Sequence, residues 1–352
     1  MKMNMSELDY HFVHNNFKLN GFNLNEEDLC RIAYSFIKEG ETFERAVGDF
    51  ILDWFSKDDF ITIKTSGTTG VPKLIKVEKQ AMVNSAIATG KFFDLDAGIR
   101  ALHCLPTQYV AGKMMLVRAF ILGWELDLVE PSLSLLERGD TIYNFAAMVP
   151  LQAQHSYNNL HKIKKIILGG AKVNQVLSDQ LSKLPSQVYE TYGMTETVTH
   201  IAAKKIGEQA FTVLPNVNIE QDERQCLVID PYVICKESII TNDIVDIVNE
   251  NQFIWLGRYD NVINSGGVKL FPEQIEEKLS GLIDERYFVK GISDEKLGEK
   301  LVLIIEGNPY EISQEVFSKL DKFEKPKDVL FVEKFEETAS GKVIRNKSLV
   351  TV

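Results

Sequence analysis

The stretch Lys64-Thr65-Ser66-Gly67-Thr68-Thr69-Gly70-Val71-Pro72-Lys73 decides how the fold of this chain is interpreted. It lies between two β-patterned runs, 60–63 and 74–77, which predicts a loop joining two strands. Its glycines permit positive φ and close backbone approach, so backbone N–H groups and hydroxyls can surround a polyphosphate. It is not a Walker loop, because no Gly-Lys-Ser/Thr follows and the next segment is a strand. Taken alone, the stretch is equally compatible with a polar hairpin turn.

The composition limits the classes of function. With 352 residues, 45% of them hydrophobic, the chain can form one large domain and a smaller one. A net charge of −11 argues against binding to nucleic acid or to an anionic membrane surface. The four cysteines are scattered without metal-ligand spacing, which favours reduced thiols. No apolar run has the length of a signal peptide or a membrane span, so we expect a cytoplasmic protein without membrane insertion.

Hydrophobic patterning predicts an α/β fold. Residues up to about 60 are expected to form a helical lead-in, with a helix cap at Asn25, and a further helix is expected over 81–93. Strand-like apolar runs then alternate with helical ones. These runs are 101–105, 116–122, 126–129, 142–149 and 163–168. Short strands with turn signals over 213–255 predict an antiparallel, distorted β-barrel section.

The composition changes again near residue 260. A helix is expected over 273–279, a strand over 301–305 and a helix near 312–320. We therefore expect a large domain at 1–259, which binds ATP and the acid, and a small, mobile α+β domain at 260–352.

The Gly/Ser/Thr-rich stretch closely resembles the phosphate loop of the adenylate-forming enzymes, a superfamily of acyl-CoA synthetases, adenylation domains and luciferases. The resemblance implies an ATP-binding role for Thr65, Ser66, Gly67, Thr68, Thr69, Gly70 and Lys73.

A second stretch, Tyr189-Glu190-Thr191-Tyr192-Gly193-Met194-Thr195-Glu196, resembles the next signature of that family. The resemblance implies that Tyr192 and Gly193 bind ATP, with the aromatic ring on adenine. It also implies that the Thr195 hydroxyl meets the α-phosphate and that Glu196 holds Mg²⁺. A hard cation prefers carboxylate oxygen, and a flat base gains from an aromatic face. By itself this pattern is also compatible with a strand-to-helix turn that contains a structural glutamate.

Further stretches in the family order extend the nucleotide site. The pair Gly169-Gly170 resembles the loop beside the acyl carboxylate and adenine, so Gly169 is expected at the acid and Gly170 at ATP. In Thr241-Asn242-Asp243 the family has Thr-Gly-Asp, and the resemblance implies that Asp243 binds the ribose. Asn242 replaces the glycine and also tolerates positive φ. Arg258 resembles the second ribose contact.

The end of the chain resembles the mobile part of the family. Asp260 matches the hinge, and Gly266 and Gly267 lie in a loop like the one that lines the pantetheine tunnel for CoA. Thr338-Ala339-Ser340-Gly341-Lys342 resembles the last signature, which implies that Lys342 is the catalytic lysine. Glu336 stands where a proline is usual. The resemblance covers about residues 60–347, and fewer residues precede the phosphate loop than is usual in the family.

The stretch from Leu105 to Arg118, Leu-Pro-Thr-Gln-Tyr-Val-Ala-Gly-Lys-Met-Met-Leu-Val-Arg, indicates the acid. It resembles a segment of o-succinylbenzoate–CoA ligases of menaquinone biosynthesis, with Tyr109 in place of the usual histidine. Such an acid carries a second carboxylate, which Lys113 or Arg118 can pair in a charge-assisted contact. The alternative is that both side chains point to solvent on a helix.

The resemblance as a whole implies an AMP-forming ligase that makes o-succinylbenzoyl-CoA through an acyl-adenylate and releases AMP and pyrophosphate. ATP, CoA and Mg²⁺ are the implied co-substrates and metal, and the acid is a small molecule. Two alternatives stay open at this point: a ligase for another carboxylic acid, and a non-catalytic nucleotide-binding remnant of the fold. The sequence does not indicate the oligomeric state.

Overall fold

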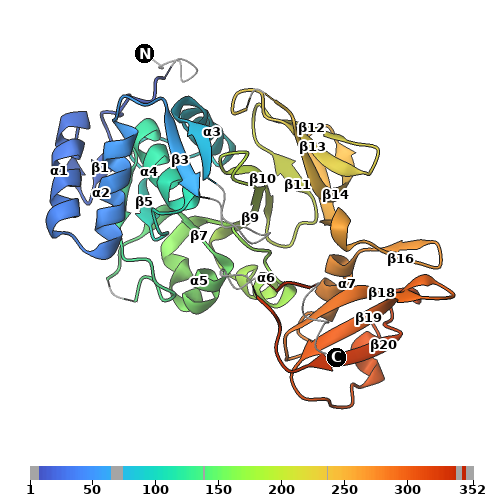
Figure 1. Cartoon of the computed structure of the whole chain (residues 1–352). Helices are drawn as coiled ribbons and strands as arrows, with labels where there is room; N and C mark the ends of the chain where they lie inside the picture. Colours follow the sequence, from blue (N-terminus) through green and yellow to red (C-terminus); the bar gives the residue numbers. More distant parts are fainter. Residues whose placement is uncertain (1–7, 65–73, 138, 236, 338–342, 346–352) are drawn as a thin grey trace.

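The structure, a computed structural model, describes residues 8–64, 74–137, 139–235, 237–337 and 343–345 (Figure 1). The helical lead-in is formed by α1 (Glu26–Glu39) and α2 (Thr42–Trp54). Helix α1 begins as predicted after Asn25, whose side chain accepts a hydrogen bond from the backbone of Asp28 at 3.0 Å. The lead-in is not entirely helical, however. The strands β1 (Lys18–Leu19) and β2 (Phe22–Asn23) add an edge to the main sheet and are too short to give a periodic signal.

The two strands predicted on either side of the Gly/Ser/Thr-rich stretch are confirmed. Strands β3 (Phe60–Lys64) and β4 (Leu74–Glu78) pair antiparallel, with Lys64 opposite Leu74. Residues 65–73, which carry the expected phosphate contacts, lie outside the described residues.

A parallel sheet forms the centre of the molecule. Its strands are β5 (Arg100–His103), β6 (Glu125–Leu128), β7 (Tyr143–Met148), β8 (Ile163–Leu168) and β9 (Gln187–Gly193). Successive residues of a strand pack against the helices on opposite faces of the sheet. Phe145 packs in the core formed with α3 (Lys79–Phe92) and α4 (Val110–Leu122), whereas Ala146 packs in the core formed with α5 (Pro150–His155), the 3₁₀ helix η2 (Tyr157–Lys162) and α6 (Gln175–Leu181). The prediction of α/β layers is therefore confirmed.

One strand-like run is a helix. Residues 116–122 belong to α4, in which every residue from Met114 to Leu122 is buried. A helix that is apolar on all sides has no amphipathic period, so it cannot be distinguished from a buried strand by its pattern.

The same sheet continues as an antiparallel section, in agreement with the prediction for 213–255. It contains β10 (His200–Lys205), β11 (Phe211–Val213), β12 (Asn218–Gln221), β13 (Cys226–Asp230), β14 (Ile239–Asn249) and β15 (Gln252–Arg258). The change from parallel to antiparallel pairing occurs at β9, which lies between β8 and β10.

Beyond Arg258 the chain builds a separate sheet with its own core (Figure 1, orange to red). Its elements are η3 (Tyr259–Asn261), β16 (Ile263–Ser265), β17 (Val268–Leu270), α7 (Pro272–Leu279), β18 (Tyr287–Asp294), β19 (Gly298–Glu306), η4 (Gln314–Phe317) and β20 (Asp328–Val332). The helix expected near 312–320 is only the short η4. Of these elements, α7 packs against β15 of the main sheet.

No helix in the described part of the chain has the length and apolar character that crossing a membrane requires.

Candidate active site

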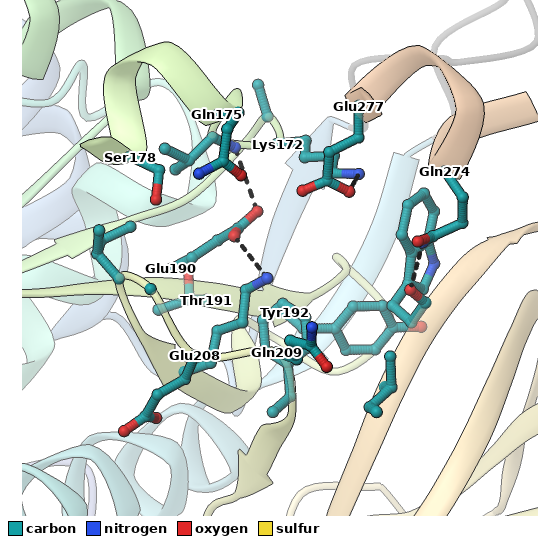
Figure 2. A pocket seen from close by; sticks show the side chains of 18 of the residues that line it. Lys172, Gln175, Ser178, Glu190, Thr191, Tyr192, Glu208, Gln209, Gln274 and Glu277 are labelled. Carbon is teal, nitrogen blue, oxygen red and sulfur yellow. Dashed lines mark hydrogen bonds and ion pairs between the residues drawn. The ribbon is translucent and has the colours of Figure 1, made fainter. Parts of the chain in front are cut away.

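A cavity of about 750 Å³ lies between the main sheet and α7 (Figure 2). It is bordered by the loop after β8, the end of β9, the β10–β11 segment and strands β14 and β15. Ligand sites of α/β sheets form beyond the carboxyl ends of parallel strands, where the connection pattern changes. The cavity lies at that place, because β9 is the last strand of the parallel part.

Two glycines shape the backbone around the cavity. A Cβ atom at Gly193 would lie 2.3 Å from the carbonyl oxygen of Thr199, so only glycine allows this approach. Gly170 has a φ of +82° and lines the cavity, while Gly169 precedes it and donates to the carbonyl of Met148 at 3.2 Å. Of the predicted Gly-Gly turn, Gly170 is thus at the cavity edge.

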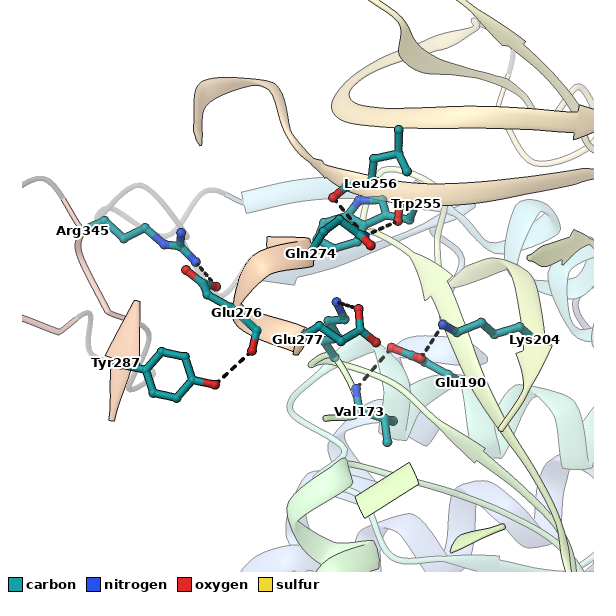
Figure 3. Close-up of polar contacts among 11 residues, drawn as sticks. Val173, Glu190, Lys204, Trp255, Leu256, Gln274, Glu276, Glu277, Tyr287 and Arg345 are labelled. Carbon is teal, nitrogen blue, oxygen red and sulfur yellow. Dashed lines mark hydrogen bonds and ion pairs between the residues drawn. The ribbon is translucent and has the colours of Figure 1, made fainter. Parts of the chain in front are cut away.

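Glu190 provides a buried carboxylate in the cavity wall (Figures 2 and 3). One of its oxygens accepts from the backbone N–H of Val173 at 3.2 Å, and the other lies 3.2 Å from Nζ of Lys204. These contacts join the loop after β8 to β9 and β10. They hold the turn that contains Gly170 in a fixed position.

Asp243 also lines the cavity and accepts hydrogen bonds from three side chains. Its carboxylate accepts from Tyr192 Oη at 2.7 Å, Trp255 Nε1 at 3.1 Å and Arg258 Nη1 at 3.3 Å. Burial raises the pKa of Tyr192, and the adjacent Asp243 charge raises it further. Tyr192 therefore stays protonated as a donor. The predicted adenine-side and ribose-side residues form one network.

Helix α7 closes another side of the cavity (Figure 3). Lys172 forms an ion pair with Glu277 at 2.8 Å and lies 5.2 Å from the ring centre of Trp255. Gln274 donates to the carbonyl oxygens of Trp255 and Leu256, each at 3.1 Å.

On the far side of α7, Arg345 forms an ion pair with Glu276 at 2.8 Å. The helix is thus held between the main sheet and its own sheet.

The loop after β9 carries Thr195 and Glu196. The Thr197 hydroxyl accepts from the backbone N–H of Met194 at 3.0 Å and lies 2.7 Å from the carbonyl oxygen of Thr199. Val198 has a φ of +66°, a conformation that is strained for a β-branched residue and is typical of functional loops. Glu196 is exposed next to this tight turn, so its carboxylate can reach a ligand.

The two candidate cations of α4 face different surroundings. Arg118 is 1% exposed, and its Nη2 donates to Thr199 Oγ1 at 3.4 Å. Its Nη1 donates to Met115 Sδ at 3.8 Å and its Nε has no partner among the described residues. No carboxylate in the described part of the chain pairs with the guanidinium. Burial lowers the pKa of Arg118 to about 9. The alternative that the Arg118 side chain points to solvent, which the sequence left open, is therefore wrong.

Lys113 instead lies over the Phe50 ring of α2, with Nζ 4.8 Å from the ring centre. Burial lowers its pKa, while Asp53 and Asp49 act in the opposite sense. Tyr109 caps the start of α4 and is exposed. The structure does not bring Lys113 and Arg118 together.

The expected hinge and CoA-side residues lie beyond β15. Asn242 donates to the Asp260 carboxylate at 3.3 Å and accepts from Arg224 at 3.0 Å. Gly266 and Gly267, with φ of +57° and +85°, form the two-residue turn between β16 and β17. Lys342 lies outside the described residues.

The described residues contain no preformed cluster of metal ligands. Mg²⁺ commonly uses one or two carboxylates together with substrate phosphates, and a single exposed Glu196 fits that donor set. The metal would then be held jointly by protein and nucleotide.

The sequence model of the AMP-binding enzymes matches residues 37–222, more than half of the chain. The chain belongs to the AMP-binding enzyme family. A crystal structure of an acyl-CoA synthetase (AMP-forming)/AMP-acid ligase II-like protein from Dyadobacter fermentans is 36% identical, with a TM-score of 0.62. The match covers 90% of this chain and 97% of that one.

Curated relatives of this AMP-binding enzyme include 2-succinylbenzoate–CoA ligases. The Lactococcus lactis ligase is 24% identical over 82% of this chain and 70% of its own, and the Bacillus cytotoxicus ligase is 27% identical over 84% and 71%. The Bacillus subtilis o-succinylbenzoate–CoA synthetase, solved with ATP and magnesium, has a TM-score of 0.70 at 21% identity and covers 81% of this chain and 69% of that one. The predicted adenylate-forming fold is confirmed.

The sequence motifs did not indicate the roles of Glu190, Lys204 and Trp255. Glu190 has a detectable signal, because it alternates with Tyr192 along β9 and so faces the same side. Lys204 lies opposite Glu190 through the pairing of β10 with β9, and Trp255 reaches the cavity through the pairing of β15 with β11 and β14. The residue pattern does not specify these pairings.

Proposed function

We propose that this AMP-binding enzyme is an acid–CoA ligase that activates o-succinylbenzoate with ATP and transfers the acyl group to CoA. The observation that carries the proposal is Arg118. A buried guanidinium without an acidic partner in the described residues is costly unless an anion binds to it. The second carboxylate of o-succinylbenzoate supplies such an anion, and the named ligases among the curated relatives act on this acid.

The network at Asp243 suits the nucleotide. Its carboxylate is fixed by Tyr192, Trp255 and Arg258, so it can accept from ribose hydroxyls without rearranging. The Tyr192 side chain borders the cavity next to Gly170, where a flat base can stack.

Thr195 and Glu196 stand on the strained loop between that site and Arg118. Thr195 would donate to the α-phosphate, and Glu196 with phosphate oxygens would hold Mg²⁺. The metal, when bound, would neutralise phosphate charge. The succinyl carboxylate would attack the α-phosphorus and displace pyrophosphate. The CoA thiol would then displace AMP from the acyl-adenylate.

The test is an assay of the purified protein with ATP, Mg²⁺ and CoA across a panel of acids. We expect o-succinylbenzoate to give the highest kcat/KM for acyl-CoA formation, with AMP and pyrophosphate released. A panel member that lacks the ring carboxylate, 4-oxo-4-phenylbutanoate, is the matched control and should be a poor substrate. A higher kcat/KM for another acid would overturn the substrate, and ATP binding without acid-dependent AMP formation would overturn the catalytic role.

A further inference from the structure

Arg118 is linked to three polar side chains that lie inside the protein between α3, α4 and β10. Thr89 and His200 are buried, and Thr199 is partly buried. His200 Nε2 lies 3.2 Å from Thr89 Oγ1, and His200 Nδ1 lies 3.4 Å from Thr199 Oγ1. Thr199 in turn accepts from Arg118 Nη2 at 3.4 Å. These contacts form a continuous chain from α3 to the guanidinium.

The hydrogen bonds of Thr89 determine which groups donate and which accept along this series of contacts. The Thr89 hydroxyl donates its single proton to the carbonyl oxygen of Ser85 at 3.0 Å. Its oxygen can therefore only accept from His200, so the imidazole proton is on Nε2. Burial lowers the pKa of His200 well below its usual value, and Arg118 lowers it further. The imidazole is therefore neutral, and Nδ1 is an acceptor.

An acceptor at Nδ1 orients Thr199. The Thr199 hydroxyl donates to Nδ1 and keeps its lone pairs for Arg118. Arg118 is thus held through Nη2 by Thr199 and through Nη1 by Met115 Sδ, while Nε has no partner among the described residues. Edge-on packing of the Phe93 ring, 6.0 Å away, keeps the His200 ring in place.

We propose that His200 is a positioning residue for acid recognition, which fixes Arg118 through Thr199 so that the guanidinium is preorganised for the ring carboxylate of the acid. The proposal rests on the proposed function.

Two variants of His200 test the roles of its two ring nitrogens separately. In His200→Asn the amide oxygen takes the place of Nδ1 and can still accept from Thr199, but the bond to Thr89 is lost. In His200→Gln the amide nitrogen takes the place of Nε2 and can still donate to Thr89, but no acceptor faces Thr199. Thr199→Ser and Thr199→Val form a second pair, which keeps or removes the hydroxyl while leaving His200 in place.

The measurement is the KM for o-succinylbenzoate and for 4-oxo-4-phenylbutanoate in each variant, with the KM for ATP as a control. For the dicarboxylic acid we expect His200→Gln and Thr199→Val to raise KM about five- to tenfold, the effect of one lost hydrogen bond. His200→Asn and Thr199→Ser should stay within about twofold. The monocarboxylic acid and ATP should be unaffected in all four variants.

Equal losses for both acids would overturn the proposal, because a merely structural role does not distinguish them. An unchanged KM in Thr199→Val would also overturn it, and this variant decides the question if the His200 variants do not fold. Failure of the wild-type enzyme to use o-succinylbenzoate would overturn the proposed function as well. Normal wild-type turnover with unaffected variants would overturn the positioning role alone.

Discussion

Tyr192 and Asp243 form a hydrogen bond of 2.7 Å although strands β10, β11 and β15 lie between their own strands in the sheet. In a flat sheet, strands four positions apart are separated by about 19 Å. The contact therefore requires the antiparallel section to curl back on itself. This curvature is what makes the predicted section barrel-like. It also brings together the residues on the nucleotide side of the cavity.

Asp243→Asn should weaken ATP binding. The substitution removes the charge that the three donors and the expected ribose hydroxyls share, and hydrogen bonds to charged groups are worth about 1.5–3 kcal/mol, roughly 10- to 150-fold in affinity. The dissociation constant of ATP, measured by calorimetry, checks this. Trp255→Phe removes one donor and keeps the carboxylate, so its effect should be smaller. Equal ATP affinities of the wild type and Asp243→Asn would exclude Asp243 from the site.

Structural features that depend only on residues adjacent in the sequence could be predicted from the sequence. The cap at Asn25 and the strands on either side of the Gly/Ser/Thr-rich stretch are local patterns, and both are present. The partner of Tyr192 could not be predicted in this way, because it depends on how far the sheet curves.

The acid side could not be resolved from the sequence either. Lys113 and Arg118 are five residues apart on one helix, which separates them by about 140° around its axis. Because α4 is buried on nearly all sides, hydrophobic periodicity does not indicate which face meets which neighbour. Packing against α2 draws Lys113 to Phe50 and leaves Arg118 beside Thr199.

Arg118→Met should change activity and stability in opposite directions. Loss of a charge-assisted contact should raise the KM for o-succinylbenzoate by about 10- to 150-fold, equivalent to roughly 1.5–3 kcal/mol. Removal of a buried cation that no carboxylate among the described residues pairs should stabilise the ligand-free protein by about 0.5–2 kcal/mol. Steady-state kinetics and urea unfolding measure the two effects. Lys113→Met is the matched control and should leave this KM nearly unchanged, and a similar KM increase in both variants would contradict the assignment.

His103 should make stability depend on pH. It is buried against Thr107, with 3.1 Å between Nε2 and the hydroxyl, and burial lowers its pKa from 6.5 to about 4. As the pH falls, His103 is protonated in the unfolded chain at a higher pH than in the folded protein. Its contribution to the free energy of unfolding is therefore fully present above about pH 6.5 and is lost as the pH falls towards 4. At pH 5 the loss is about 2 kcal/mol. The free energy of unfolding at pH 7.5 and pH 5 should differ less in His103→Gln, whereas an identical difference would refute this origin.

Lys342→Ala should separate the two half-reactions. The family resemblance implies that this lysine lies beside the attacking carboxylate and the α-phosphate only while the adenylate forms. Removing one preorganised contact to developing negative charge costs roughly 2.7–4 kcal/mol, about 10²–10³ in rate. Acid-dependent pyrophosphate exchange should fall by that factor, while the reaction of synthetic o-succinylbenzoyl-adenylate with CoA should stay close to the wild-type rate.

The matched control for Lys342 is Lys334→Ala, which removes an exposed lysine that follows β20 in the same sheet region. Lys334→Ala should not change the melting temperature appreciably, since exposed charges contribute little to stability. The melting temperature of Lys342→Ala shows whether that variant is folded. Pyrophosphate exchange should be normal in Lys334→Ala. If Lys342→Ala slows both half-reactions equally in a folded protein, the lysine does not act in one step alone, and the expected rotation of residues 260–352 between the steps would lose its main support. If it slows neither, Lys342 is a solvated charge and the adenylation step relies on Thr195, Glu196 and the phosphate loop.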